Sequence, residues 1–351
     1  MAPSTLSDGR FSGASALRHV WHPVASEGQL GDGPIARTLC GTDLVLFRDG
    51  EGRAVALPDR CSHRNAPLSV GTVADGCVEC PYHGWRFDGA GRCVEVPAIG
   101  PGPVPPKAHL TPFHATIRYG LVWVSLDEPR VEIPPCPWDE DDAYRRLNNP
   151  VEVWEASTTR MVDNFMDISH FPWVHIGSFG AAADRVVPQF ELGPLPDGFT
   201  GYAYEVDAAN QDGAAASGQT GAVVHRAMST GFSIPFTVRS TIRYETGLEH
   251  ILYLLTAPID DERSYFTFVV WRNDDFSVPQ DEVLQLDHKI ASEDRWMLER
   301  VPGALPLGND GVVSVRSDRP SVEWKRQLVQ FLGSGAVTPE AGEGDTTAAV
   351  S

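Results

Sequence analysis

Short apolar runs separated by glycine and proline mark the first part of the chain. Residues 44–47 (Leu-Val-Leu-Phe) and 121–124 (Leu-Val-Trp-Val) are runs of the kind that forms buried strands, and turn residues alternate with them. We therefore predict an all-β domain over residues 17–130. Residues 1–16 are small and polar, and we expect them to be loose.

The second part of the chain combines strand-like and helix-like segments. Three segments have a β-like composition: residues 232–244, 250–257 and 264–271. Residues 281–301 follow with helical periodicity. This order predicts an α+β domain over residues 131–333, in which a curved antiparallel sheet wraps around helices. Residues 334–351 contain little hydrophobicity, and we expect a disordered tail.

The helical segment 281–301 has one apolar stripe with acidic residues near it. Projected at about 100° per residue, Asp294 falls roughly 30° from the centre of the stripe, Asp287 about 50° and Glu293 about 70°. A carboxylate on an apolar face is costly unless it is paired or binds a metal. Asp294 is therefore the first candidate for a metal-binding carboxylate, and a solvated acid at the helix edge is the alternative.

The composition indicates a soluble enzyme with room for two domains in 351 residues. No run approaches the eighteen or so apolar residues of a membrane span, and the N-terminus lacks a signal-peptide pattern. We expect a cytoplasmic location without a membrane partner. A formal charge of −19 excludes nucleic acid as a partner, because phosphates would be repelled. The same acidity would steer a redox partner with a basic face, or serve solubility alone.

Two short segments in the first domain each contain a cysteine and a histidine close together, and we call these segments clips. Cys61 and His63 form one clip, and Cys80 and His83 form the other, with sixteen residues between the clips. Two thiolates and two imidazoles are the ligand set of a Rieske [2Fe–2S] centre, in which the cysteines hold one iron and the histidines hold the other. A structural zinc site uses the same ligand types at short spacings and is the alternative.

The residues around the clips favour the iron–sulfur cluster over zinc. The second clip continues as Cys-Pro-Tyr-His-Gly-Trp-Arg-Phe-Asp, and the first continues through residues 64–68 as Arg-Asn-Ala-Pro-Leu. Both resemble Rieske cluster loops. Pro81 fixes one backbone angle beside a ligand, Gly84 permits a tight turn, and Trp85 can shield the cluster from water.

A second group of ligand-type side chains lies in residues 163–175, Asp-Asn-Phe-Met-Asp-Ile-Ser-His-Phe-Pro-Trp-Val-His. Mononuclear non-haem Fe(II) oxygenases hold iron with two histidines and one carboxylate, leaving open positions for O2 and substrate. On a regular helix His170 and His175 would lie about 140° apart, so we expect Pro172 to distort the helix between them. An ordinary amphipathic helix with polar core histidines is the alternative.

The segment also resembles the Asn-x2-Asp-x2-His-x4-His motif of Rieske non-haem iron oxygenase α subunits. It follows the Rieske clips in the order and at the distance typical of that family. The resemblance extends from about residue 17 to about residue 332, and the chain length suits the compact monooxygenase branch. That branch includes vanillate and dicamba O-demethylases and caffeine-type N-demethylases. The resemblance implies a helix-grip catalytic domain behind the Rieske domain.

The resemblance implies the iron ligands and the route of the electrons. His170, His175 and Asp294 would bind the mononuclear Fe(II), since residues 293–295 resemble the third-ligand segment of the family. Asp167 lies three residues before His170, where it can accept a hydrogen bond from that imidazole. In the family the equivalent Asp bridges to a Rieske histidine of the next subunit, so electrons would cross the interface of a homotrimer.

For two residues of the segment, a purely structural role is the alternative to the role that the resemblance implies. Asn164 matches a family position close to the iron, or it is a plain helix residue that hydrogen-bonds locally. Asp167 would contact His63 or His83 of a neighbouring subunit, or it only orients His170. The sequence alone leaves both pairs of alternatives open.

The implied chemistry requires partners outside this sequence. Oxygenation by O2 at one Fe(II) takes two external electrons, which a Rieske centre passes one at a time. The sequence has no Gly-x-Gly-x-x-Gly fingerprint and no flavin motif, so NAD(P)H must be oxidised by a separate reductase, directly or through a ferredoxin. The expected function is a terminal oxygenase that hydroxylates or oxidatively demethylates a small aromatic or heteroaromatic substrate.

Other reactions and another class of protein remain as alternatives. Similar sequences in the family oxidise an aromatic amine to a nitro group or act as ring-hydroxylating dioxygenases. A non-catalytic Rieske electron carrier predicts no second iron, and a zinc-stabilised binding module predicts a colourless protein. Pocket residues should come from alternate positions of the strands between residues 200 and 271. His225, His250 and Asn273 are polar candidates there, unless they are structural or exposed.

Overall fold

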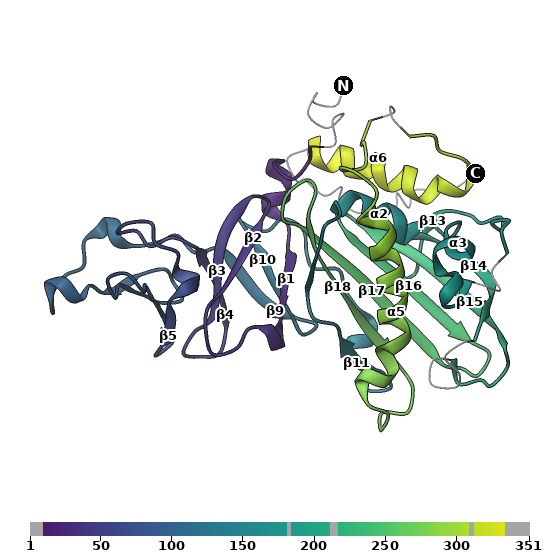
Figure 1. The fold of residues 1–351 in the computed structure, drawn as a ribbon, viewed down its shortest axis with the longest axis horizontal. Helices are drawn as coiled ribbons and strands as arrows, with labels where there is room; N and C mark the ends of the chain where they lie inside the picture. The colour runs from purple at the N-terminus through teal and green to yellow at the C-terminus, as the bar shows by residue number, and fades with distance from the viewer. Residues whose placement is uncertain (1–9, 181–183, 211–216, 309–311, 334–351) are drawn as a thin grey trace, which may run out of the picture.

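The structure is a computed structural model, and it describes residues 10–180, 184–210, 217–308 and 312–333. Two domains follow one another along the long axis of the molecule (Figure 1). The first contains only short strands and single helical turns, and the second is built on one large sheet with helices. The predicted combination of an all-β domain and a helix-grip domain is confirmed.

The first domain consists of three small antiparallel sheets, in the strand orders β1-β10-β9, β2-β3-β4 and β5-β6-β7-β8. The strands are β1 (His22–Ser26), β2 (Ile35–Leu39), β3 (Thr42–Arg48), β4 (Ala54–Pro58), β5 (Thr72–Ala74), β6 (Cys77–Glu79), β7 (Arg86–Phe87), β8 (Cys93–Glu95), β9 (His114–Arg118) and β10 (Leu121–Ser125). The two apolar runs singled out in the sequence lie in β3 and β10 and are buried.

The start of the chain is more ordered than its composition predicted. Residues 1–9 lie outside the described residues, but Phe11 is only 1% exposed, and Ser15–His19 forms a 3-10 helix with Leu17 buried. These residues pack with Trp324 of the last helix in one hydrophobic core. The expectation of a loose segment is therefore wrong for residues 11–16, because one large aromatic side chain anchors them.

The hairpin turn between β5 and β6 packs closely against the β3–β4 turn, and a glycine permits this approach. Gly76 has a φ of +70°, and a Cβ there would lie 2.1 Å from the backbone nitrogen of Gly50. We expect Gly76→Ala to destabilise the first domain by roughly 3 kcal/mol or more, because strain and a backbone clash add. Urea unfolding followed by circular dichroism measures the loss.

A second glycine supplies the control for that prediction. Gly52 has a φ of +78°, but a Cβ there would meet no other atom within 4 Å, so Gly52→Ala costs only the backbone strain, about 1 kcal/mol. Equal losses in the two variants would show that the close approach of Gly76 to Gly50 contributes nothing.

The second domain contains an eight-stranded antiparallel sheet in the order β11-β18-β17-β16-β15-β14-β13, with β12 also paired to β18. The strands are β11 (Arg145–Asn148), β12 (Glu152–Trp154), β13 (Gly193–Pro194), β14 (Thr200–Ala209), β15 (Val223–Ser233), β16 (Thr237–Tyr244), β17 (Glu249–Pro258) and β18 (Ser264–Arg272). The helices are α2 (Thr158–Met166), α3 (Phe171–Val174), α5 (Gln280–Leu298) and α6 (Arg319–Gly333).

One of the three strands expected in the second domain differs from the sequence prediction. The expected strand 232–244 is divided, because the chain turns at Ile234-Pro235 between β15 and β16. The other two expected strands correspond to β17 and β18, and the expected helix 281–301 corresponds to α5. The predicted tail, residues 334–351, lies outside the described residues.

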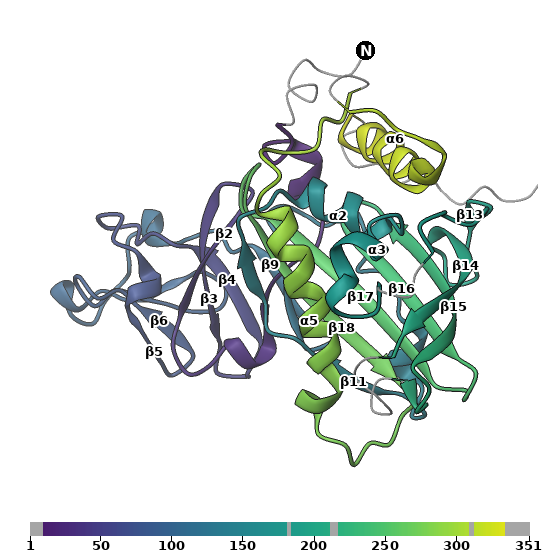
Figure 2. The same ribbon diagram turned by 45° about the vertical axis from the view of Figure 1, so that its right-hand side comes forward.

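Alternation along β17 and β18 gives the sheet two buried faces. Tyr253 and Trp271 point towards the first domain and pack in one core with its Trp123. Leu252 and Phe268 point the other way and pack with the helices. All nine residues of β18 are buried as a result. Figure 2 shows α2, α3 and α5 together on that second face, which we call the helix-side face.

Among the described residues, no helix has the length and apolar character needed to cross a membrane.

Candidate metal centres

The two cysteine–histidine clips lie side by side in the first domain. Cys61 and Cys80 are each 1% exposed, and their thiols interact with one another. His63 and His83 are exposed, with ring centroids 4.5 Å apart. Trp85 stacks on His63 at 4.7 Å with parallel rings, which covers one face of that imidazole. The fold thus presents a buried sulfur pair and an exposed imidazole pair, and this arrangement fits a [2Fe–2S] cluster with one pair on each iron.

The two cluster loops share one backbone geometry. The N–H of Asn65 donates to the carbonyl of Cys61 at 2.9 Å, and the N–H of Gly84 donates to the carbonyl of Cys80 at 3.0 Å. Both donors are in the left-handed region, with φ of 56° and 71°, which Asn and Gly tolerate best. The tight turn expected at Gly84 is confirmed. Burial raises the pKa of the Cys61 thiol to about 11, and a bound iron would have to displace that proton.

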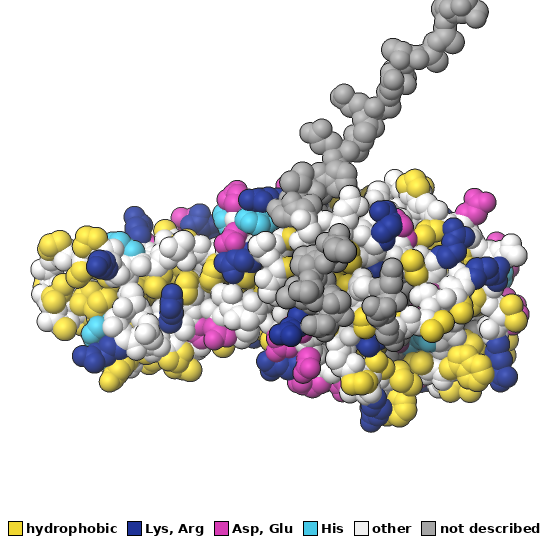
Figure 3. Space-filling view, turned by 90° about the horizontal axis from the view of Figure 1, so that it is seen from above, with side chains coloured by type: hydrophobic (Ala, Val, Ile, Leu, Met, Phe, Trp, Pro, Cys, Tyr) yellow, Lys and Arg dark blue, Asp and Glu magenta, His cyan; other side chains and the backbone are white. Residues whose placement is uncertain are grey.

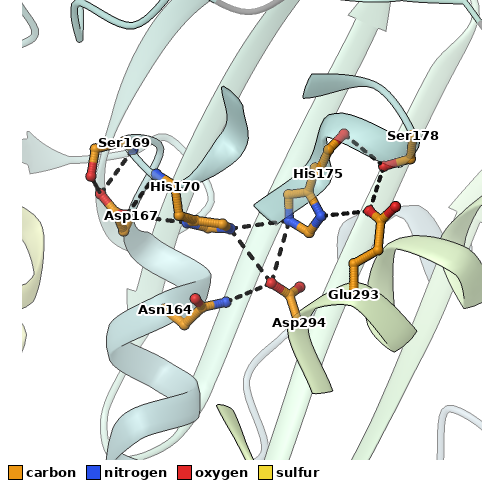
Figure 4. Close-up of polar contacts among 8 residues, drawn as sticks. All are labelled: Asn164, Asp167, Ser169, His170, His175, Ser178, Glu293 and Asp294. Carbon is orange, nitrogen blue, oxygen red and sulfur yellow. Dashed lines mark hydrogen bonds and ion pairs between the residues drawn. The ribbon is translucent and has the colours of Figure 1, made fainter. Parts of the chain in front are cut away.

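His170, His175 and Asp294 converge in the second domain (Figure 4). One donor atom from each lies within 4.8 Å of the others. The Nε2 atoms of the imidazoles are 3.1 Å apart, and Oδ1 of Asp294 lies 3.5 Å from His170 Nε2 and 3.3 Å from His175 Nε2. Two nitrogens and one carboxylate oxygen facing one point form the donor set of a mononuclear Fe(II) site, so the residues present fit that ion.

The segment that carries the two histidines is broken into two helices. α2 ends at Met166, and Asp167 has an extended backbone with φ of −86° and ψ of 140°. His170 precedes the short helix α3, and His175 follows it. The expected single helix distorted by Pro172 is therefore wrong. Pro172 instead lies in the first turn of α3, where proline is favoured because the N–H it lacks has no partner there.

Asp167 caps the break and holds His170. Its Oδ2 accepts hydrogen bonds from the backbone N–H and the Nδ1–H of His170, at 3.0 and 3.1 Å. Its Oδ1 accepts from the N–H and Oγ–H of Ser169, at 2.9 and 2.6 Å. Burial raises the pKa of Asp167, but these donors outweigh burial and lower it. Asn164 donates from Nδ2 to Oδ1 of Asp294 at 2.9 Å, so both residues of the motif contact the site.

Glu293 is a site residue that the helical projection placed furthest from the apolar stripe. Its Oε2 accepts hydrogen bonds from Nδ1–H of His175 at 2.9 Å and from the hydroxyl of Ser178 at 2.6 Å. Adjacent residues on α5 thus approach His175 from two sides, Asp294 at Nε2 and Glu293 at Nδ1. The bond at Nδ1 leaves the lone pair on Nε2 free for a metal. In the sequence, Glu293 was the lowest-ranked acid of the projection and a neighbour of Asp294 in the segment that resembles the family's third-ligand segment.

We expect Glu293→Gln to weaken Fe(II) binding about 10-fold or more, because the amide accepts a weaker hydrogen bond from His175 and carries no charge. Titration of apo protein with Fe(II) under anaerobic conditions measures the affinity. Glu282→Gln is the matched control, since Glu282 is exposed in the first turn of the same helix. A Glu293→Gln protein with unchanged affinity would contradict the orienting role.

The electrostatics of the second site favour a cation between the imidazoles and the carboxylate. Burial raises the pKa of Asp294, but hydrogen bonds with His170 and His175 outweigh it and hold that pKa well below its usual range. Burial lowers the pKa of His170, but hydrogen bonds with Asp167 and Asp294 outweigh it and raise the pKa to about 9. The carboxylates thus make the site electronegative, and a divalent metal ion bound at Nε2 of His170 would have to displace a proton.

A cavity adjoins the three converging residues on the helix-side face of the sheet. Its volume is about 100 Å³, and it is partly open to solvent. Aromatic and aliphatic side chains make up most of the lining: Phe165, Phe171, Phe179, Met228, Ile242, Leu252, Leu254, Phe266, Phe268, Ile290 and Ala291. Such a lining suits a small aromatic ligand.

None of the three polar pocket candidates lines this cavity. His225 points away from the helix-side face and pairs with Asp207 at 3.0 Å. Asn273 accepts a hydrogen bond from the backbone of Glu249 and donates to Gly247, so its role is structural. His250 is buried beneath the cavity, with Nε2 at 3.3 Å from Oδ1 of Asp287.

Strand alternation explains why His225 misses the cavity. Its neighbours on either side in β15 are buried, whereas His225 is on the outward face. Asp287, the second-ranked carboxylate of the helical projection, does line the cavity but stands apart from the three converging donors.

A Rieske-type cluster domain joined to a helix-grip domain with a two-histidine, one-carboxylate site defines the class of Rieske oxygenase α subunits. The family model of the Rieske [2Fe–2S] domain matches residues 20–113, and that of the vanillate O-demethylase oxygenase C-terminal domain matches residues 154–332. This chain belongs to the Rieske non-haem iron oxygenases. It is an oxidoreductase with a [2Fe–2S] cluster and a mononuclear iron that uses O2 and electrons supplied by a reductase.

Individual relatives agree with this assignment. Methylxanthine N1-demethylase NdmA of Pseudomonas putida is 31% identical over 333 residues, which cover 89% of this chain and 88% of that protein. The dicamba O-demethylase oxygenase component of Stenotrophomonas maltophilia is 36% identical over 163 residues, 45% of this chain and 48% of that protein. The solved structure of Pseudomonas putida CBB5 NdmA with caffeine has a TM-score of 0.79 at 28% identity, covering 96% of this chain and all of that one.

Proposed function

We propose that this chain is the terminal monooxygenase of a multicomponent system, which hydroxylates or oxidatively demethylates a small aromatic or heteroaromatic substrate. The observation that carries the proposal is the convergence of His170, His175 and Asp294 at the wall of a cavity lined by aromatic side chains. Methylxanthine, dicamba and toluene-4-sulfonate are named as substrates in the relatives' own descriptions, which supports an aromatic substrate class.

The ligand assignments form part of the proposal. Cys61, His63, Cys80 and His83 would hold the [2Fe–2S] cluster, and His170, His175 and Asp294 would hold the mononuclear Fe(II). When bound, the mononuclear iron would supply the activation of O2. The protein's own residues keep that site in place: Asn164 fixes the oxygen of Asp294 that faces the imidazoles.

The overall reaction balances with two external electrons. A substrate C–H, O2, two electrons and two protons give a C–OH and water. Where the hydroxylated carbon is a methyl group on oxygen or nitrogen, the product collapses with loss of formaldehyde and leaves the demethylated substrate. The electrons come from NAD(P)H through a separate reductase or ferredoxin, and the apolar cavity lining would exclude water from the oxidising site.

A homotrimer would explain how electrons reach the second site. The cluster domain and the helices of the second site lie towards opposite ends of the long axis (Figure 1), so a path within one chain is long. His63 and His83 are exposed, and hydrophobic side chains gather at the cluster end of the molecule (Figure 3). Exposed apolar residues of that domain are Val70, Tyr82, Val94 and Ile99. We propose that this surface meets Asp167 of a neighbouring subunit.

The metal content of the purified protein tests the proposal. Anaerobically prepared protein is expected to contain about three irons and two acid-labile sulfides per chain. Two of each after incubation with Fe(II) would instead identify an electron carrier. Reconstitution with a reductase and O2 then tests demethylation or hydroxylation of aromatic substrates. A cytoplasmic location, supported by four cysteines that are neither cluster ligands nor in a disulfide, is also part of the proposal.

A further inference from the structure

One charged side chain in the cavity has no role in binding iron. β15 alternates between buried and more exposed residues, and Arg226 is one of those that point to the helix-side face. Arg226 is 3% exposed and lines the same cavity as His170 and His175. In the sheet it lies opposite Tyr244 of β16, and Met228 follows two residues later on the same face of β15. A guanidinium therefore faces the space next to the iron site.

Arg226 lacks a polar partner among the described residues. Its guanidinium lies over the rings of Phe179 and Tyr244, at 5.4 Å from each centroid, and these contacts position it. No carboxylate oxygen of the described residues lies within 4.0 Å of its nitrogens, and Nε is buried without a hydrogen bond. The nitrogens at the end of the side chain make no hydrogen bond to a described residue either.

The other buried arginines of the sheet are paired, which makes Arg226 distinct. Arg239 lies 2.7 Å from Asp197, and Arg272 lies 3.0 Å from Asp274. A guanidinium cannot shed its proton to avoid the cost of burial, so it needs an anion or a hydrogen-bond acceptor. Both of these buried arginines thus face a carboxylate, whereas Arg226 faces none among the described residues.

Asp287 does not supply it. This carboxylate lines the cavity, but its Oδ1 faces His250, whose other ring nitrogen accepts from Arg272 at 3.0 Å. Because Arg272 is an obligate donor, Nδ1 of His250 is the acceptor, and Nε2 lies 3.3 Å from Asp287 without forming a hydrogen bond. Asp287, His250 and Arg272 form one continuous set of contacts, and Arg226 lies outside it.

We infer that the substrate of this oxygenase carries a carboxylate, and that Arg226 is the residue that binds it. The inference rests on the proposed function and narrows its substrate class from small aromatic compounds to aromatic acids. The planar fork of a guanidinium matches the two oxygens of a carboxylate. With the acid end fixed at Arg226, the aromatic ring lies against the apolar lining, and a group elsewhere on the ring faces the iron site.

Binding of matched acids and amides tests the inference without turnover. The probes are benzoate, 4-methoxybenzoate and indole-3-carboxylate, each compared with its primary amide by calorimetry on the anaerobic, iron-loaded protein. At least one acid is expected to bind 10-fold or more tightly than its amide. Arg226→Gln is expected to remove that difference. Arg243→Gln, an exposed position on β16 paired with Glu249, is expected to preserve it.

Two results would overturn the inference. In one, no acid binds the wild-type protein more tightly than its amide. Arg226 and Asp287 would then both contact the polar edge of an uncharged ligand. In the other, the preference for an acid survives in Arg226→Gln. Either result leaves the metal content untouched, so failure of the inference is distinguishable from failure of the proposed function, which a protein with two irons per chain would show.

The stability of the ligand-free protein gives a second readout. Arg226→Met is close in volume and can still pack on the two aromatic rings, but it removes the unpaired charge together with its cation–π contacts. Its Tm is therefore expected to stay close to that of the wild type. A benzoate-type ligand should then raise the Tm of the wild type and not that of Arg226→Met. A large drop in Tm without ligand would mean that Arg226 supports the fold, and would count against a binding role.

Discussion

Replacing His175 with alanine is expected to remove the mononuclear iron and to lower product formation by roughly 1,000-fold or more, while the visible spectrum of the Rieske cluster stays unchanged. His175 provides one of three donor atoms that lie within 4.8 Å of one another, and two donors hold Fe(II) poorly. The cluster loops are in the other domain, so the substitution leaves them intact. Iron analysis, visible absorption and product formation with a reductase measure the three effects.

The contacts of His175 define the control for that experiment. Its ring is 1% exposed and stacks on Phe179 at 5.0 Å, so alanine also leaves a cavity, and the variant is compared at a temperature well below its Tm. His225→Ala removes an exposed histidine of the same domain and should change neither iron nor rate. Loss of the Rieske spectrum together with the mononuclear iron would contradict the division of the histidines into two sites.

The sequence was most informative where one short segment holds a whole ligand pair. Cys61 and His63, and likewise Cys80 and His83, are close along the chain, so the loop itself brings them together and the spacing predicts the site. Asp294 could be chosen because a helix has a fixed period, and a carboxylate near an apolar stripe is conspicuous. In the structure all of these side chains lie where their pattern predicted contacts, and their roles as ligands remain proposals.

Features that depend on long-range packing were beyond the sequence. Glu293 projects away from the apolar stripe, yet His175 reaches it because the chain between α2 and α3 turns back towards α5. Arg226 and His225 are neighbours, and only the register of β15 against β14 and β16 decides which of the two faces the cavity. If the register of the strand is predicted wrongly by one residue, His225 is placed at the cavity instead of Arg226.

Replacing Asp167 with asparagine is expected to slow turnover about 10- to 100-fold while both iron sites stay filled. The carboxylate of Asp167 accepts four hydrogen bonds, two from His170 and two from Ser169. An asparagine has one accepting oxygen, so its amide nitrogen must face a backbone N–H on one side or the other. The orientation of His170 then loosens, and the proposed route of electrons from a neighbouring Rieske histidine is interrupted.

Stopped-flow oxidation of the reduced cluster by O2, with substrate present, separates these effects from a change in fold. The Asp167→Asn protein should keep its iron and its visible spectrum but reoxidise slowly. Ser169→Ala removes a single hydroxyl donor and leaves the charge, so it should lose less than about 3-fold. If Asp167→Asn reoxidises at the wild-type rate, the carboxylate serves only to cap the break after α2, and the electrons must reach His170 by another path. A slow rate with intact metals requires the charge or the second accepting oxygen of Asp167, because the two side chains are nearly equal in size.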